Sequence, residues 1–315
     1  MSRPLAVVAV GGNALIRDSA HTSLHDQYDA VCATAPHIVD MVEAGWNVVL
    51  THGNGPQVGF ILRRSEIADG QVPTVPVRYA VGDTQGAIGF MFQNALGNAL
   101  CERGLQTPVV AVVTQTVVDR ADPAFEQPDK PIGSFMTQAL AQQFARELGW
   151  SVMQDGPRGW RRCIASPQPL RIVEAPLIAP LVQAGTLVIA CGGGGIAVEQ
   201  TSDGRLIGVE AVVDKDRASA LLALELGADL LVIPTGVERV AIRFGQPDER
   251  WLDRISIEQA ESYAAQGEFG KGSMLPKIEA LLRFVKARPG GRGVITHPES
   301  IARALRGETG TWIDA

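Results

Sequence analysis

Three lysines lie where their positive charge could assist phosphoryl transfer. Lys130 is followed by a stiff proline and a glycine, Lys215 lies between two aspartates, and Lys277 follows a glycine-led helix entrance. A cation at a helix start opposes the helix dipole, so Lys215 needs another reason to be there. Because phosphoryl transfer depends mainly on positioning and charge stabilisation, all three are candidate catalytic residues. The alternative for each is a solvated surface lysine, and Asp214 can be either a catalytic acid or a simple helix N-cap.

Three glycine-containing loops follow expected strands. They are Gly11-Gly12-Asn13, Gly53-Asn54-Gly55 and the run Gly192 to Gly195, which contains Gly193 and Gly194. Glycine lets backbone N–H groups approach an anion closely, and a following helix N-terminus adds partial positive charge. One such loop could be only a tight turn, but three at one sheet edge predict phosphate or carboxylate binding. Neither GxxxxGK[ST] nor a helix-opening GxGxxG occurs.

Two further motifs have an open interpretation. His52 directly follows a strand and could act as a general acid or base, but a packed histidine is favoured because no nucleophile stands at a suitable spacing. Arg161 and Arg162 could clamp an anion through bidentate contacts, or they could be solvated.

The elements that would carry these residues alternate between strand and helix. Short runs rich in Val, Ile and Leu predict buried strands at 5–10, 47–51, 108–114, 186–191 and 230–234. Three- and four-residue apolar spacing predicts helices at 83–103 and 214–226. This alternation is typical of an α/β fold with a three-layer αβα sandwich around a mainly parallel sheet. Ligands of such sheets bind beyond the carboxyl ends of the strands, where the glycine loops lie.

The segment 119–174 interrupts the alternation. It is richer in Pro, Arg and Gln and contains only a short amphipathic helix, so we expect an inserted lid. The alternation then resumes, with helices expected at 256–265, 275–287 and 298–305 and a strand at 293–296.

Composition excludes several classes of protein. The 315 residues are 46% apolar, enough for a sizeable core, and 28 basic against 34 acidic residues give a net charge of −6, which argues against a nucleic-acid partner. No apolar run is long enough to span a bilayer or to form a signal-peptide core, so we expect no membrane partner and a cytoplasmic location. The cysteines, Cys32, Cys101, Cys163 and Cys191, form no CxxC pair; we expect reduced core residues and no protein-bound metal.

Ten strings in one order make the sequence resemble carbamate kinases of the amino-acid kinase family. They run from VVAVGGNAL through VVLTHGNGPQVG, TQGAIGF, VVTQTVVDRADPAF, DKPIGSFMT, DGPRGWRR, SPQP, ACGGGGI and GVEAVVDKDRAS to GSMLPKIEA, covering about residues 6 to 296. The resemblance implies one amino-acid-kinase domain over 1–315 with an eight-stranded, mostly parallel sheet. It also implies a protruding lid subdomain within 119–174, a nucleotide-binding part at 210–315 and a homodimer.

The same resemblance implies an activity and a set of site residues. Carbamoyl phosphate and MgADP would give carbamate and MgATP, usually at the end of arginine or ureide catabolism, with Mg²⁺ carried by the nucleotide. Catalytic roles would fall to Lys130, Lys215, Lys277 and Asp214. Substrate would be bound by Gly11, Gly12, Asn13, Gly53, Asn54, Gly55, Gly193 and Gly194. The nucleotide would contact Thr235, Gly236, Val237, Ser273, Met274 and Lys277.

A few residues depart from the family pattern. Ala197 stands where proline is usual and would loosen the glycine-rich loop. Asp83 would place a carboxylate near an anion site unless it caps a helix or meets an arginine. Arg239 and Phe244 lie in the nucleotide-side segment. Two alternatives therefore stay open: a related kinase that phosphorylates another small carboxylate or carbamate, and a non-catalytic sensor of nucleotide or carbamoyl phosphate.

Overall fold

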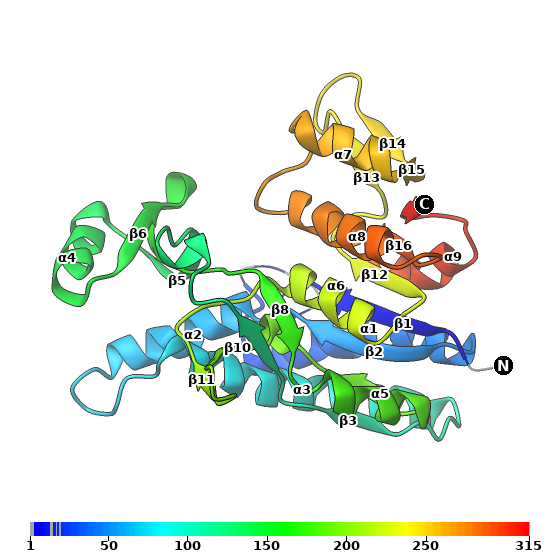
Figure 1. The fold of residues 1–315 in the computed structure, drawn as a ribbon, viewed down its shortest axis with the longest axis horizontal. Helices are drawn as coiled ribbons and strands as arrows, with labels where there is room; N and C mark the ends of the chain where they lie inside the picture. The colour runs from blue at the N-terminus through cyan, green and yellow to red at the C-terminus, as the bar shows by residue number, and fades with distance from the viewer. Residues whose placement is uncertain (1–2, 13–14, 17, 19, 315) are drawn as a thin grey trace.

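The centre of the protein is an eight-stranded sheet (Figure 1). The computed structural model describes residues 3–12, 15, 16, 18 and 20–314, so Asn13 lies outside the described residues. In spatial order the strands are β15 (Arg254–Ser256), β17 (Thr311–Asp314), β16 (Arg292–Thr296), β12 (Leu230–Pro234), β1 (Leu5–Val10), β2 (Asn47–His52), β9 (Leu187–Ile189) and β3 (Val109–Ala111). All neighbours are parallel except β16 and β17. The expected mainly parallel, eight-stranded sheet is confirmed.

Helices cover both faces of this sheet, which explains why its central strands are apolar along their whole length. In β1, Val7 and Ala9 point to one face, while Ala6, Val8 and Val10 point to the other. One face packs against α1 (Leu24–Glu43), α3 (Val77–Glu102) and α9 (Ile301–Leu305). The other packs against α5 (Ala175–Gln183), α6 (Lys215–Glu225), α7 (Ile257–Ala265) and α8 (Leu275–Ala287). The expected three-layer sandwich is therefore present.

Smaller sheets extend this body. A four-stranded sheet contains β11 (Leu206–Gly208), β10 (Ile196–Gln200), β4 (Gln115–Val118) and β8 (Pro169–Ile172), and a hairpin pairs β13 (Val240–Ile242) with β14 (Arg250–Leu252). A three-stranded sheet of β5 (Lys130–Met136), β7 (Trp160–Ile164) and β6 (Ser151–Gln154) carries α4 (Gln138–Leu148). With α4, this three-stranded sheet projects from the body as a separate lobe (Figure 1), which we call the projecting lobe, residues 130–164.

The projecting lobe is shorter than the 119–174 segment expected to protrude. Residues 169–172 form β8 and pair with β4, so the C-terminal end of that segment returns to the body. The lobe rests on α2 (Gly55–Ile67), where Ile132 and Ile164 join a small apolar cluster with Val58 and Leu62. It is therefore anchored at its base.

Several element boundaries differ from the sequence expectation. The helix expected at 83–103 begins six residues earlier, at Val77, after an extended Pro76 at the N-cap position. Burial of Val77, Ala80 and Val81 in the core outweighs the modest helix propensity of this β-branched and glycine-containing stretch. The strand expected at 108–114 is shortened to 109–111, and that at 186–191 to 187–189.

The cysteine expectation is half wrong. Cys163 and Cys191 are buried, but Cys32 and Cys101 are exposed, on α1 and α3 respectively. All four are free thiols. Within the part of the chain that the structure describes, no helix combines the length and apolar character required to cross a membrane.

Candidate functional site

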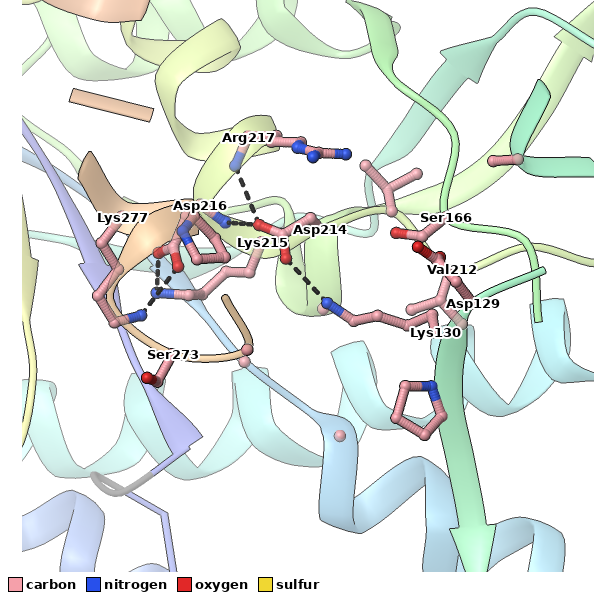
Figure 2. A pocket seen from close by; sticks show the side chains of 18 of the residues that line it. Asp129, Lys130, Ser166, Val212, Asp214, Lys215, Asp216, Arg217, Ser273 and Lys277 are labelled. Carbon is pink, nitrogen blue, oxygen red and sulfur yellow. Dashed lines mark hydrogen bonds and ion pairs between the residues drawn. The ribbon is translucent and has the colours of Figure 1, made fainter. Parts of the chain in front are cut away.

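A cavity of about 870 Å³ opens beyond the carboxyl ends of β1, β2 and β12 (Figure 2). Gly11 and Gly12 follow β1, Gly53 follows β2, and Thr235 follows β12. The cavity is also lined by Asn54, Gly55, Lys130, Gly193, Asp214, Lys215, Asp216, Arg217, Lys271, Ser273 and Lys277. The parallel topology thus brings together loops that are more than 200 residues apart in the chain, as expected for a sheet of this class.

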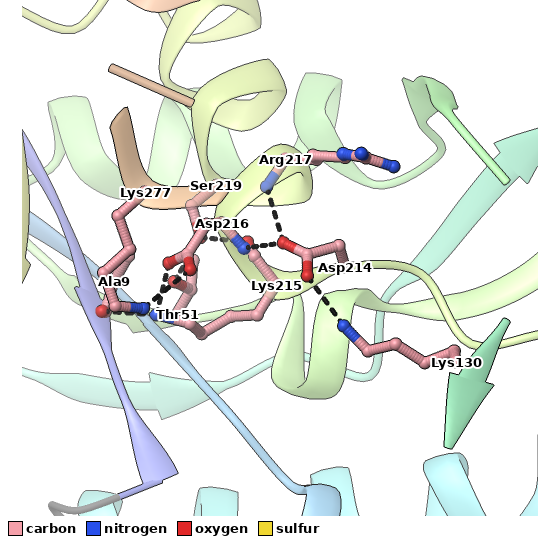
Figure 3. A network of polar contacts seen from close by, with 9 residues as sticks. All are labelled: Ala9, Thr51, Lys130, Asp214, Lys215, Asp216, Arg217, Ser219 and Lys277. Atoms are coloured by element: carbon pink, nitrogen blue, oxygen red, sulfur yellow. Dashed lines mark hydrogen bonds and ion pairs between the residues drawn. The ribbon is translucent and has the colours of Figure 1, made fainter. Parts of the chain in front are cut away.

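Two lysines in the cavity share one aspartate (Figure 3). Lys215 Nζ lies 2.7 Å from Asp216 Oδ1 and donates a hydrogen bond of 2.7 Å to the Ala9 carbonyl oxygen, and Lys277 Nζ donates to Asp216 Oδ2 at 2.9 Å. The Lys215 side chain is only 11% exposed. These lysines are therefore fixed in the wall of the cavity, and the alternative of solvated surface lysines is wrong for both.

The charges of Lys277 and Asp216 alter the pKa of Lys215, and the charges of both lysines alter the pKa of Asp216. Burial lowers the pKa of Lys215, and the neighbouring Lys277 charge lowers it further, while Asp216 opposes both effects. Burial also disfavours ionised Asp216, but the two lysines outweigh it and hold its pKa below the usual range. Two ammonium groups around one carboxylate leave positive charge facing the cavity, which suits a phosphate-bearing ligand.

Lys130 approaches from the opposite side, on the first residue of β5. Its Nζ donates to Asp214 Oδ2 at 2.9 Å, and with 40% of its side chain exposed it is the most accessible of the three lysines. Asp214 is at the same time the N-cap of α6, because its Oδ1 accepts from the backbone N–H of Asp216 and Arg217. The two interpretations of Asp214 are thus compatible: one oxygen caps the helix and the other holds Lys130.

The environment of Asp214 favours its ionised form strongly. Burial opposes ionisation, but the charge and hydrogen bond of Lys130, the capping hydrogen bonds and the Lys215 charge together lower its pKa to about 2. Asp214 is therefore an anion at neutral pH and can hold a cation in place.

The glycine run after β9 is the most crowded wall of the site. Gly193 has φ +64°, and a Cβ there would lie 1.9 Å from the Asn54 side-chain nitrogen; Gly195 has φ +85°, and its Cβ would meet Thr116 Oγ1 at 2.2 Å. The backbone must pass close to neighbouring groups here, which only glycine allows. This close passage places Gly193 at the cavity surface beside Asn54.

Some residues expected in the site do not line the cavity. Gly194 is buried and its carbonyl accepts a hydrogen bond from Thr116, while Met274 precedes α8 without a capping side-chain hydrogen bond and packs against the core. Gly236 and Val237 follow the cavity-lining Thr235 without lining the cavity themselves. Asn13 lies outside the described residues.

The residues whose role was open have distinct positions. His52 is 1% exposed, its Nδ1 lies 3.0 Å from the Gly53 carbonyl oxygen, and its ring stacks near Phe92. Burial lowers its pKa to about 4, so the ring is neutral at physiological pH. His52 is therefore a packed histidine that orders the adjacent loop.

Two supposed departures from the family pattern lie away from the cavity. Asp83 is exposed in the second turn of α3 and caps no helix, so it brings no carboxylate to the anion site. Ala197 is buried within β10, paired with Thr116, and does not loosen a loop. The expectation attached to each residue was wrong, because the Asp83 side chain is exposed outside the cavity and Ala197 is held by strand pairing with Thr116.

Arg239 and Phe244 are also outside the cavity lining. Arg239 pairs with Asp253 at 2.7 Å, and Phe244 meets the Trp251 ring edge-on. Arg161 pairs with Asp155 at 3.0 Å, and the Arg162 guanidinium stacks 4.6 Å from the Trp150 ring. Neither of the latter two arginines lines the lysine cavity.

Asp216 lines the cavity and was not among the predicted site residues, and the same is true of Asp129, Arg217 and Lys271. For Asp216 the sequence carried only a weak signal, the acidic residue in the first turn of α6, because neighbouring side chains on a helix do not normally face each other and Lys277 is 61 positions away. Among the described residues, no group of three or more His, Cys, Asp or Glu side chains is arranged to hold a metal ion.

The sequence and the fold of this chain have counterparts in known proteins. The model of the amino acid kinase family matches residues 4–296. The chain belongs to the amino acid kinase family. This membership agrees with the α/β fold described above.

Individual relatives of this amino acid kinase are similar over nearly their whole length. "Carbamate kinase-like protein YahI" of Escherichia coli is 48% identical, covering 99% of both chains, and the carbamate kinase of Thermococcus kodakarensis is 44% identical, covering 98% of both. The solved carbamate kinase of Giardia lamblia bound to AMP-PNP superposes with a TM-score of 0.93 at 38% identity, covering 99% of this chain and 98% of that one.

Proposed function

We propose that this amino acid kinase is a carbamate kinase, which transfers a phosphoryl group reversibly between carbamoyl phosphate and MgADP to give MgATP and carbamate. The observation that carries the proposal is the set of three lysines held by two aspartates in one cavity at the carboxyl edge of the sheet. Relatives bearing the name carbamate kinase, 40–44% identical over nearly the whole chain, support this choice of substrate.

The geometry supports transfer between two ligands bound on opposite sides. Lys215 and Lys277 sit together at the starts of α6 and α8, whereas Lys130 reaches in from the projecting lobe. In an in-line transfer, donor and acceptor oxygens lie on opposite sides of the phosphorus, and the negative charge is spread over the equatorial oxygens. Fixed lysines on either side stabilise that charge throughout the transfer.

The two aspartates have a positioning role in this mechanism. Asp216 holds Lys215 and Lys277 close together although they repel each other, and Asp214 aims Lys130 at the same space. Because the lysines are already in place, little reorganisation is needed when the phosphoryl group moves. Mg²⁺ enters as part of the nucleotide substrate, MgADP or MgATP.

The remaining site residues follow from the same proposal. Gly11 and Gly12 offer backbone donors to carbamoyl phosphate, and Asn54 offers the amide hydrogen that it does not donate to Thr84. Gly53 lines the same wall, although its backbone N–H donates to the Val10 carbonyl oxygen. Thr235 and Ser273 lie on the side expected to hold the nucleotide. The enzyme would act in the cytoplasm as a homodimer. Its product would be ATP at the end of a catabolic route such as arginine breakdown.

A second candidate is a kinase of the same fold with a different small carboxylate or carbamate acceptor. It is favoured by relatives at 48% and 46% identity whose names read carbamate kinase-like protein. Asp83 gives it no support, because that side chain is exposed outside the cavity. A non-catalytic sensor is disfavoured, since all three lysines that the transfer would use are present and line one cavity.

The deciding experiment is ATP formation by the purified protein from MgADP and carbamoyl phosphate. The K130A variant serves as the control for contaminating kinases. Rapid ATP formation that K130A abolishes would support carbamate kinase activity. Absence of ATP from a correctly folded protein would contradict it, and phosphorylation of a panel of small carboxylates would then identify the acceptor of the second candidate.

A further inference from the structure

A second cavity, of about 490 Å³, lies between the projecting lobe and the four-stranded sheet. The lobe contributes Trp150 and Arg162, and β10 and β11 contribute Glu199 and Ile207. None of its lining residues belongs to the lysine cavity. It is therefore a separate hollow, to which the proposed carbamate kinase reaction assigns no part.

Three arginines from distant parts of the chain meet at this cavity. Arg78 comes from α3, Arg120 from the loop after β4, and Arg162 from β7. Arg162 is half-buried, and among the described residues no carboxylate lies within ion-pair distance of it. Arg120 likewise has no ion pair in the described part of the chain; its guanidinium stacks 4.4 Å from the Phe125 ring.

Removal of Arg162 from water is compensated only in part. Its guanidinium lies 4.6 Å from the centre of the Trp150 ring, a cation–π contact that leaves the edge N–H donors of the fork free. Burial lowers its pKa, whereas the more distant charges of Glu210 and Glu66 raise it without outweighing burial. A desolvated cation with unused donors is costly, and an anionic ligand would offset that cost.

The carboxylates of the cavity do not neutralise these arginines. Glu210 is committed to Arg78, at 2.6 Å, and to the backbone N–H of Val77, at 2.8 Å, which fixes both groups at the start of α3. Glu199 also lines the cavity and is half-buried, without an ion pair among the residues described. Three arginines against two carboxylates give the cavity lining a net positive charge. Arg120 and Arg162 carry the part of it that no ion pair in the described part of the chain neutralises, since Arg78 is paired with Glu210.

We propose that this second cavity binds a small oxyanion of the phosphate type, held by Arg162 and Arg120. Guanidinium groups bind phosphate through paired N–H donors, and two of them approaching from different elements match its two negative charges. Arg78, fixed by Glu210, forms the third side. Glu199 weakens the binding, because its charge opposes that of the ligand.

Inorganic phosphate is the probe, measured by equilibrium dialysis against the full-length protein. The lysine cavity would bind phosphate as well, so K277A and R162Q are compared with the wild type. We expect two binding sites in the wild type, of which R162Q weakens one by roughly tenfold or more, the loss expected for a charge-assisted bidentate contact. K277A is expected to weaken the other site and leave this one unchanged. R146Q, which alters an exposed arginine of α4 outside the cavity, is the matched control.

A second variant keeps the test independent of the folding of R162Q. E199Q removes the opposing charge without touching the arginine stack, and we expect it to tighten phosphate binding about threefold, within the usual range for one nearby charge. Unchanged phosphate binding in both R162Q and E199Q would overturn the proposal. Displacement of phosphate by an equal concentration of succinate would overturn the phosphate assignment. Because carbamate kinase activity is assayed separately, either proposal can fail without the other.

Discussion

Asp216 is the one carboxylate that pairs with both Lys215 and Lys277 among the described residues. Without its charge, Lys215 and Lys277 would repel each other and move apart. We expect D216N to lower kcat by about 100-fold or more, comparable with the loss of one transition-state contact. Steady-state kinetics would test this, with D69N, at an exposed position outside the cavity, as the control. A near-normal kcat would show that the lysines need no common partner.

The three lysines themselves provide a second prediction. K130A, K215A and K277A are each expected to lower kcat by orders of magnitude, since one transition-state charge contact contributes about 3 kcal/mol. The matched control is K286A, because Lys286 lies on the same helix as Lys277 but pairs with Glu261 at the exposed C-terminal end. A lysine whose replacement leaves turnover intact has no role in the transfer.

His52 gives a prediction about stability rather than activity. Its pKa is about 4 in the folded protein and 6.5 when unfolded, so between these values the unfolded chain binds the extra proton. The free energy of unfolding should therefore fall as pH decreases from 6.5 towards 4. Protonation of His52 in the unfolded chain should account for a loss of roughly 2 kcal/mol at pH 5. Urea unfolding at pH 7 and pH 5 should show a smaller acid loss in H52Q than in the wild type. Equal losses would mean that His52 does not titrate in this range.

Residue type and local sequence were enough to predict some of the site residues. The lysines and glycine loops could be selected from the sequence, because a cation at a helix start and glycines after strands are locally unusual. The partners could not, because Asp216 and Lys277 are 61 positions apart and only the sheet brings them together. For the same reason, the position of Asp83 outside the cavity could not be foreseen.

At the level of elements, the projecting lobe is the part expected to respond to ligand. Lys130 pairs with Asp214 in the structure, and a phosphate-bearing ligand would compete with Asp214 for the Lys130 ammonium group. We expect the lobe to close over bound carbamoyl phosphate and exclude water from it. Backbone hydrogen exchange in residues 130–164 should slow when carbamoyl phosphate is added, while α1 serves as the internal reference. Unchanged exchange in the lobe would argue against closure.

Element boundaries were predictable where local signals and burial agree. β1, β12 and α8 have the ends expected from their apolar runs, and α6 starts directly after its Asp214 cap. The start of α3 was missed, since its first turns are held by packing against the core and not by helix propensity. The 119–174 segment could be recognised as unusual, but the pairing of its last strand with β4 is a long-range contact that composition does not reveal.

For the whole molecule, the testable expectation is the homodimer. Light scattering on the purified protein should give twice the 33.5 kDa mass of one chain. A single species of one chain mass would contradict the dimer without affecting the fold. The layered architecture itself could be predicted from alternating strands and helices, whereas the strand order could not, because it depends on which crossovers the chain takes.

The glycine run after β9 also has a consequence for sequence variation. Its backbone lies against three separate segments: Asn54 after β2, Thr116 on β4 and Val213 before α6. Added carbon atoms at consecutive positions would strike different neighbours, so no single compensating change elsewhere could accommodate them. In a saturation mutagenesis library selected for folded protein, codons 193 to 195 should accept almost nothing but glycine, while the open turn at Gly204 should accept residues that tolerate positive φ. The sequence of this wall of the cavity would then change more slowly during evolution than the sequence of the elements around it.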